Sequence, residues 1–178
     1  MMRTTFSLST VVLLLASWLV VADDRARDSE ASVASQKSNP QDQLLAIIVN
    51  RSNPVEGLSY ADLRQIFLGQ RSYWPHGRKI TLVMREPGQA EREAVLRAVY
   101  GMSERDFNRH FLQAKFTGEV LAAPKLLSTA AGVKKFVLNV PGAIAYVRLN
   151  ELDDSVKPIH IDNQAPGDPG YKLRVPLP

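Results

Sequence analysis

The chain has 178 residues, of which 45% are hydrophobic, and it carries a formal net charge of +4 and no cysteine. This length and hydrophobic content are enough for one folded domain with its own core. The lack of cysteine excludes disulfide bonds, thiol nucleophiles and thiolate metal sites. A mildly basic chain is compatible with a small acidic ligand or an acidic surface, so the charge alone excludes little.

The first 22 residues have the pattern of a secretory signal peptide. A basic start that contains Arg3 is followed by an apolar run, Phe6–Val21, and then by Ala22 directly before Asp23. We expect cleavage after Ala22, which leaves an exported, periplasmic protein with no stable membrane insertion. Loss of Arg3 would lower the formal charge from +4 to about +3. The alternative is a retained membrane anchor, although the run is slightly short for a span. Export also makes nucleic acid an unexpected partner.

The polar residues 23–43 predict a flexible leader, because they contain too few large apolar side chains to form a core. The folded domain is expected over 44–161. Its first seven residues, 44–50 (LLAIIVN), are typical of a central strand that is covered on both faces. A helix is predicted after Ser59, which is a suitable N-cap and is followed three residues later by Asp62, as in a capping box.

The stretch Ile80–Tyr100 predicts a strand, a turn and a helix in succession. Ile80–Met84 is apolar and reads as a buried strand, Arg85–Gly88 forms the loop, and an amphipathic helix begins at about Gln89. Such a turn aims the unpaired N–H groups of the helix at the end of the strand, and Arg85 adds a cation there. The stretch therefore indicates an anion site, or else an ordinary turn of an α/β protein.

The remaining elements are two helices, two strands and a tail. In order, they are a helix capped by Ser103 that runs to about Ala114 and is left at 115–118, an irregular link at 119–125, a helix capped by Ser128 or Thr129, an apolar strand at 143–147, an edge strand at 156–161 that contains Pro158, and a Pro- and Gly-rich tail at 162–178 that lies over the surface. This alternation implies an α/β sandwich with a mixed, mostly parallel sheet and helices on both faces.

Catalytic chemistry has little support in the sequence. His76, His110 and His160 stand in different elements, and none has a further ligand type at metal spacing. Nucleophile elbows, phosphate-binding glycine loops and zinc-protease motifs are all missing. We therefore expect no enzyme activity, no metal and no cofactor.

Two groups of side chains have both a binding and a packing interpretation. Tyr73 and Trp74 could stack on a ligand, or they could pack their turn against the sheet. The second group consists of arginines on two successive helices, which could form a docking face or simply a solvated one: Arg92, Arg97, Arg105 and Arg109.

Several motifs occur together in a characteristic order. They are 46–50 with Ser52-Asn53-Pro54, Leu58-Ser59 with Asp62-Leu63, Ile66-Phe67-Leu68-Gly69, Trp74-Pro75 with Gly77, Ile80–Arg85, Phe116-Thr117-Gly118 and Pro141-Gly142-Ala143-Ile144-Ala145-Tyr146-Val147. In this order they resemble the periplasmic phosphate-binding protein of phosphate ABC transporters and the wider PBP-like domain family. The last motif is similar to the family's P-G-A-I-G-Y-V signature, with Ala145 in place of Gly. The resemblance implies a periplasmic-binding-protein-like (type II) lobe.

The chain departs from this family in two ways. Phosphate-binding proteins hold the ligand between two lobes, whereas the resemblance covers one lobe, and we expect nothing before Leu44 to supply the other. The family's loop also looks like R-x-D-G-S-G-T. Here Arg85 and Gly88 are kept, but Pro87, Gln89 and Glu91 replace Asp, Ser and Thr. Glu91 would place a negative charge where the oxygens of an anion would lie, and Pro87 removes an N–H donor.

The resemblance implies a non-catalytic, solute-binding-like protein with a degraded phosphate loop. The candidate ligand-binding residues are Arg85, Gly88, Gln89, Ala90, Ser52 and Thr117. The partner would be a small anion that is weakly held, or an envelope protein. In the alternative interpretation, the chain is a periplasmic protein-interaction or sensory module that uses the former cleft as a docking surface. Homodimerisation could restore a two-lobed cleft.

Overall fold

The computed structural model describes residues 44–118 and 123–175, all of which belong to one compact unit, Asn39–Pro178. The predicted signal peptide and leader, residues 1–43, lie outside the described residues. Within the described ranges, no helix is both long enough and apolar enough to cross a membrane.

A five-stranded sheet forms the centre of the fold, in the order β4 (Lys125–Leu127), β3 (Thr81–Arg85), β5 (Ala143–Arg148), β1 (Leu45–Val49) and β6 (Lys157–Pro158). Strand β3 is parallel to β4 and β5, whereas β1 is antiparallel to both β5 and β6. Four strands therefore run in one direction and β1 runs against them, which confirms the predicted mixed, mostly parallel sheet. Every residue of β1 is buried, as expected for a strand with elements on both sides.

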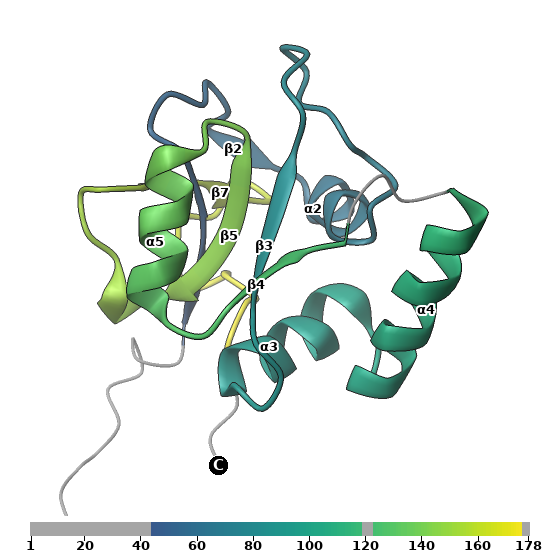
Figure 1. The fold of residues 1–178 in the computed structure, drawn as a ribbon. Helices are drawn as coiled ribbons and strands as arrows, with labels where there is room; N and C mark the ends of the chain where they lie inside the picture. Colours follow the sequence, from purple (N-terminus) through teal and green to yellow (C-terminus); the bar gives the residue numbers. More distant parts are fainter. Residues whose placement is uncertain (1–43, 119–122, 176–178) are drawn as a thin grey trace, which may run out of the picture. The chain divides into compact units, whose positions relative to one another are not determined.

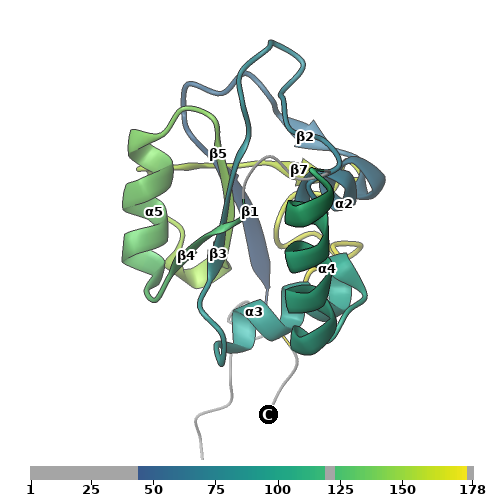
Figure 2. The same cartoon turned by 45° about the vertical axis from the view of Figure 1, so that its right-hand side comes forward.

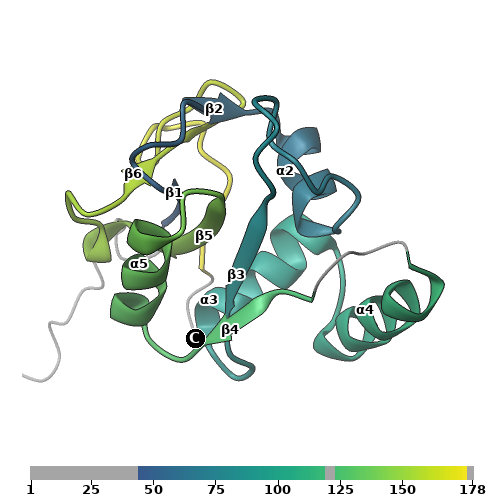
Figure 3. The same ribbon diagram turned by 45° about the horizontal axis from the view of Figure 1, so that its top comes forward.

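Helices cover both faces of this sheet (Figures 1 and 2). Helix α5 (Ala130–Asn139) packs on one face, where Val133 and Val137 meet alternate residues of β1, β3 and β5. The other face is covered by α2 (Tyr60–Phe67), α3 (Ala90–Val95), its π-helical continuation η2 (Leu96–Tyr100), and α4 (Glu104–Thr117). Figure 3 shows that α4 lies farther from α5 than α2 or α3 does.

The helix starts follow the capping signals in the sequence. Ser59, Ser103 and Thr129 are the N-caps of α2, α4 and α5, and each side chain accepts a hydrogen bond from a backbone N–H three residues later. Helix α3 differs, because its N-cap Gln89 makes no capping hydrogen bond through its side chain. Of the α-helices that the structure describes, three have starts that are fixed locally, whereas that of α3 depends on other contacts.

The structure corrects the predicted elements in four places, of which the tail is the last. Strand β4 begins at Lys125, the last residue of the stretch that we expected to be an irregular link, and its residues pair with Val83–Arg85. Thr117, which we expected to lie beyond the helix, is the last residue of α4. The predicted edge strand at 156–161 divides into β6, in the central sheet, and β7 (His160–Ile161), which pairs with β2 (Gly57–Leu58) in a second small sheet.

The segment after Ile161 is packed into the core rather than lying over the surface as we expected. Tyr171, Leu173 and Val175 are buried, and the backbone N–H of Leu45 donates to the carbonyl of Leu173 at 3.0 Å. These three residues alternate with polar ones, which is the period of an extended segment with one buried face. The Pro and Gly residues that precede them obscured this pattern.

A short 3-10 helix, η3 (Leu149–Glu151), follows β5.

Candidate functional site

The predicted anion site lies where the inner strands β3 and β5 end. The carboxyl ends of the strands form this border of the sheet, here called its edge, which is distinct from an outer strand. These strands are parallel neighbours, with Thr81 opposite Ala143 and Leu82 opposite Ile144. Their carboxyl ends therefore meet at the same edge, and each ends in an arginine, Arg85 or Arg148. The loop between β3 and α3 lies at this edge, in agreement with the general position of ligand sites in open α/β sheets.

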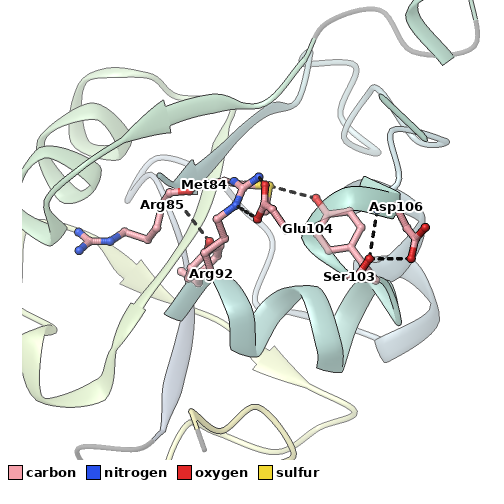
Figure 4. Close-up of polar contacts among 8 residues, drawn as sticks. Met84, Arg85, Arg92, Ser103, Glu104 and Asp106 are labelled. Atoms are coloured by element: carbon pink, nitrogen blue, oxygen red, sulfur yellow. Dashed lines mark hydrogen bonds and ion pairs between the residues drawn. The ribbon is translucent and has the colours of Figure 1, made fainter. Parts of the chain in front are cut away.

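Arg85 is held at this edge with its side chain only partly bonded. The residue is 8% exposed, and its Nη2 donates to Oε1 of Gln89 at 3.0 Å. Its Nε and Nη1 atoms are buried and have no hydrogen-bond partner among residues 44–118 and 123–175. Figure 4 shows that the side chain runs away from Arg92 and Glu104. Buried polar atoms normally have partners, so this guanidinium has unused donor capacity.

Glu91, one turn further along, is bonded within the protein. It is 8% exposed, and its carboxylate accepts a hydrogen bond from Nε of Arg148. Burial raises the pKa of Glu91, but the bond from Arg148, the N–H of Glu91 itself and the charges of Arg148 and Arg85 outweigh it and lower the pKa. The negative charge that the sequence predicted at this loop is thus present, and Arg148 neutralises it.

Arg92 points in another direction and is part of the core. It is 1% exposed, and it donates from Nε and Nη2 to the two carboxylate oxygens of Glu104 at 2.7 and 2.8 Å. Its Nη1 donates to the carbonyl of Arg85 at 2.9 Å, and its guanidinium lies 4.7 Å from the ring centre of Phe107. Figure 4 shows the bonds of Arg92 to Arg85 and Glu104. Both sequence interpretations of Arg92, a docking or a solvated face, are therefore wrong.

The other ambiguous side chains are easily placed. Arg97, Arg105 and Arg109 are exposed. Trp74 is 2% exposed and donates from Nε1 to the carbonyl of Gly142 at 3.0 Å, so it packs its turn against the start of β5. Tyr73, beside it, is 52% exposed.

The structure brings four of the six candidate residues together and places two elsewhere. Arg85, Gly88, Gln89 and Ala90 share one loop, in which Gly88 has a φ of 83°, a value that favours glycine. Ser52 follows β1, whose end pairs with the start of β5. It therefore lies at the opposite edge of the sheet, where its hydroxyl donates to Oδ1 of Asn50 at 2.7 Å. Thr117 ends α4 and donates to the carbonyl of Gln113 at 3.3 Å.

A cavity of about 180 Å³ lies at the other end of β3 from Arg85. Its lining includes Ile80 and Leu82, together with Phe111 of α4, and its cationic groups come from Arg71, Lys79 and Lys125. None of the six candidate residues lines this cavity.

The histidines do not form a catalytic group. His76 is exposed and stacks on Trp74, His110 contacts Phe111 edge-on, and the Nδ1 atom of exposed His160 lies 3.1 Å from the carbonyl of Glu56. Among residues 44–118 and 123–175, no three His, Asp or Glu side chains are placed to hold a metal ion.

Comparison with known proteins agrees with this architecture. Residues 20–170 match the family described as the PBP superfamily domain. An ABC-type phosphate transport receptor from Vibrio cholerae is similar in structure, with a TM-score of 0.58, 24% identity, and coverage of 70% of this chain and 48% of the receptor.

Two further solved structures give the same result. One is from Clostridium perfringens, is described as a phosphate ABC transporter substrate-binding protein and holds phosphate (TM-score 0.62, 23% identity, 75% of this chain and 53% of that protein). The other is PstS from Borrelia burgdorferi, with a TM-score of 0.59, 11% identity, and coverage of 75% of this chain and 55% of that protein. The chain thus spans about half the length of these structures, and at these identities the likeness supports the fold alone.

Proposed function

The chain belongs to the PBP superfamily, and we propose that it is an exported, non-catalytic, solute-binding-like protein whose phosphate loop no longer suits phosphate. One observation carries this proposal. Arg85 lies at the carboxyl end of β3, but Gln89 of the same loop already accepts a hydrogen bond from its guanidinium.

The composition of the loop supports weak phosphate binding. Phosphate is best held by several N–H and O–H donors together with a cation. Residues 86–91 contain no hydroxyl group, and Pro87 has no N–H to donate. The buried carboxylate of Glu91 already occupies the cation of Arg148, so that arginine is less available to an outside anion. Arg85 therefore keeps the cation of an anion site, whereas the surrounding donors are reduced.

The position of the loop also supports weak binding. The loop lies at the carboxyl ends of β3 and β5, and none of its residues lines the cavity of about 180 Å³ at the other end of β3. A ligand that lies on one open edge stays partly solvated, whereas pockets usually bury most of the ligand surface. We expect a dissociation constant for phosphate that is weaker than about 100 μM.

Calorimetric titration of the purified monomer with inorganic phosphate tests this proposal. The expected result is no saturable heat, or binding only at high phosphate concentration. A submicromolar affinity of the monomer would overturn the proposal, because the loop would then supply donors that its residues lack.

Export is a separate part of the proposal and rests on residues 1–22. The expected mature protein begins at Asp23, which an intact-mass measurement on protein from both the periplasmic and the membrane fractions would show. A mass that includes residues 1–22 would favour the retained anchor instead.

A second candidate function is a protein-interaction module that forms homodimers. Exposed apolar side chains favour it. Leu112 and Phe116 are 60% and 84% exposed. They are four positions apart on α4, so two large apolar side chains lie next to each other on a solvent-facing part of one helix. Light scattering at several protein concentrations tests it. The wild type is expected to associate as concentration rises, and a Leu112→Ser, Phe116→Ser variant is expected to stay monomeric. A concentration-independent monomer would remove the homodimer from consideration.

A further inference from the structure

Three charged residues lie where β3 and β5 end, and two of them are in contact. Arg85 closes β3 and Arg148 closes β5, and these parallel neighbours bring both cations to the same edge. Glu91 comes from the first turn of α3, and its carboxylate bonds to Nε of Arg148. This ion pair joins two elements that are 57 positions apart in the sequence.

The pair is well shielded from water on the acidic side. The side chain of Glu91 is 10% exposed, and that of Arg148 is 27% exposed. A charge pair with this burial is screened less than a surface pair. Two further carboxylates stand at this edge: Glu86 is exposed, and Glu151 accepts from the backbone N–H of Arg148 at 3.2 Å. Glu91 is therefore the only one of the three that is buried.

The geometry points to Glu91 as the residue that sets the charge selectivity of this edge. We propose that its carboxylate serves as an internal anion for Arg148 and Arg85, and that it thereby excludes small inorganic oxyanions. This inference rests on the proposed function, because it explains at one residue why a retained lobe with a retained arginine would bind phosphate poorly.

Glu91 and an external oxyanion would compete for the same arginine side chain. An oxyanion that approaches Arg148 must displace the carboxylate of Glu91, and one that approaches Arg85 meets the repulsion of that carboxylate nearby. The internal anion is covalently attached, so it loses no translational freedom when it binds. Without its charge, Arg148 would lose its bond to a buried carboxylate, and an anion could bind Nε and Nη1 of Arg85, which have no acceptor among the described residues, against less repulsion.

Glu91→Gln is the direct test, with Glu104→Gln as the matched control. Glu104 is also a carboxylate in the first turn of a helix that pairs with an arginine, but its partner Arg92 belongs to the core. Calorimetry and thermal unfolding would be measured with phosphate and with sulfate at low ionic strength, for the wild type and both variants. Glu91→Thr serves as a second neutral variant.

We expect Glu91→Gln and Glu91→Thr to bind phosphate and sulfate at least about tenfold more tightly than the wild type. Both variants should also unfold at a higher temperature as either anion is added. Glu104→Gln should show no such gain. A folded neutral variant of Glu91 without gain, or an equal gain in Glu104→Gln, would overturn the inference. If neither Glu91 variant folds at low salt, sulfate should restore cooperative unfolding, and failure to do so contradicts the inference.

The two proposals can fail separately in this experiment. Submicromolar phosphate binding by the wild type would overturn the proposed function. Weak binding by the wild type together with no gain in the Glu91 variants would overturn only the role of Glu91.

Discussion

Two ion pairs branch from consecutive residues at the start of α3. Glu91 pairs with Arg148 of β5, and Arg92 pairs with Glu104 of α4. In the first pair, the buried partner is the acid and the arginine reaches solvent. In the second, the buried partner is the arginine, at 1% exposure, and the acid is 37% exposed.

The number of partners also separates the two pairs. Arg92 has both carboxylate oxygens of Glu104, the carbonyl of Arg85 and the ring of Phe107 around its guanidinium. Within the part of the chain that the structure describes, Arg85 has a single side-chain partner in Gln89 and two buried nitrogen atoms without one. A fully bonded charge cluster fastens one element to another. A partly bonded group, such as Arg85, is a place where an outside group can still bind. The contrast therefore gives Arg92 a structural role and leaves the proposed selectivity of Glu91 to be tested.

The largest expected effect lies in the core pair. Glu104→Gln should lower the free energy of unfolding by about 3 kcal/mol, because it leaves the charge of buried Arg92 without its counter-ion. Arg92→Met should cost less, since Glu104 can be solvated when its partner is removed. Urea denaturation of both variants measures this difference. If Arg92→Met proved the more destabilising change, the apolar contacts of its stem and ring stacking would outweigh the buried charge.

The pH dependence of stability should link the two pairs. The bond from Arg92 lowers the pKa of Glu104 against the smaller effect of burial, and the pKa of Glu91 is also lowered. Both pairs therefore add stability that is fully present above the ordinary pKa of 4.5 and is lost as the pH falls through the lowered values of the folded state.

Urea midpoints measured from pH 7 downwards test this dependence. The decline below about pH 4.5 should be smaller in Glu91→Gln and in Glu104→Gln than in the wild type. Equal declines in all three proteins would show that other carboxylates dominate the acid response. Asp153, whose pKa the hydrogen bonds from Lys134 and Ser155 lower to about 2, is an exposed group that can be followed in the same titration.

Local signals in the sequence predicted most of the fold. Ser59 and Ser103 were identified as N-caps because a cap needs only an oxygen and an N–H three residues away. The buried strands β1 and β5 were identified by their continuous apolar runs. Strand β4 could not be identified in this way, because it has three residues, follows Pro124 and exists only through its pairing with β3.

The candidate site was predicted only in part. Arg85 and Gly88 could be identified because the loop is local and resembles a known motif. The role of Arg148 depends on the parallel register of β3 and β5, which no local pattern specifies. Arg92 was misjudged because a charged residue on a helix usually faces water. The signal that could have located it was Glu104 in the first turn of the next helix, but a pairing between two helices is a tertiary contact.

The smallest expected effect lies at Gln89. Gln89→Ala removes the one side-chain partner that Arg85 has among the described residues, and it leaves both ion pairs unchanged. Gln89 is only half-buried, so the free energy of unfolding should fall by about 0.5 to 1 kcal/mol. Chemical denaturation measures the loss, and Ala90→Ser, a change at the exposed next residue, is the matched control. A loss as large as that of Glu104→Gln would mean that Arg85 fastens the loop to the core as firmly as Arg92 does. The edge would then be a structural element, and the contrast between the two pairs would no longer hold.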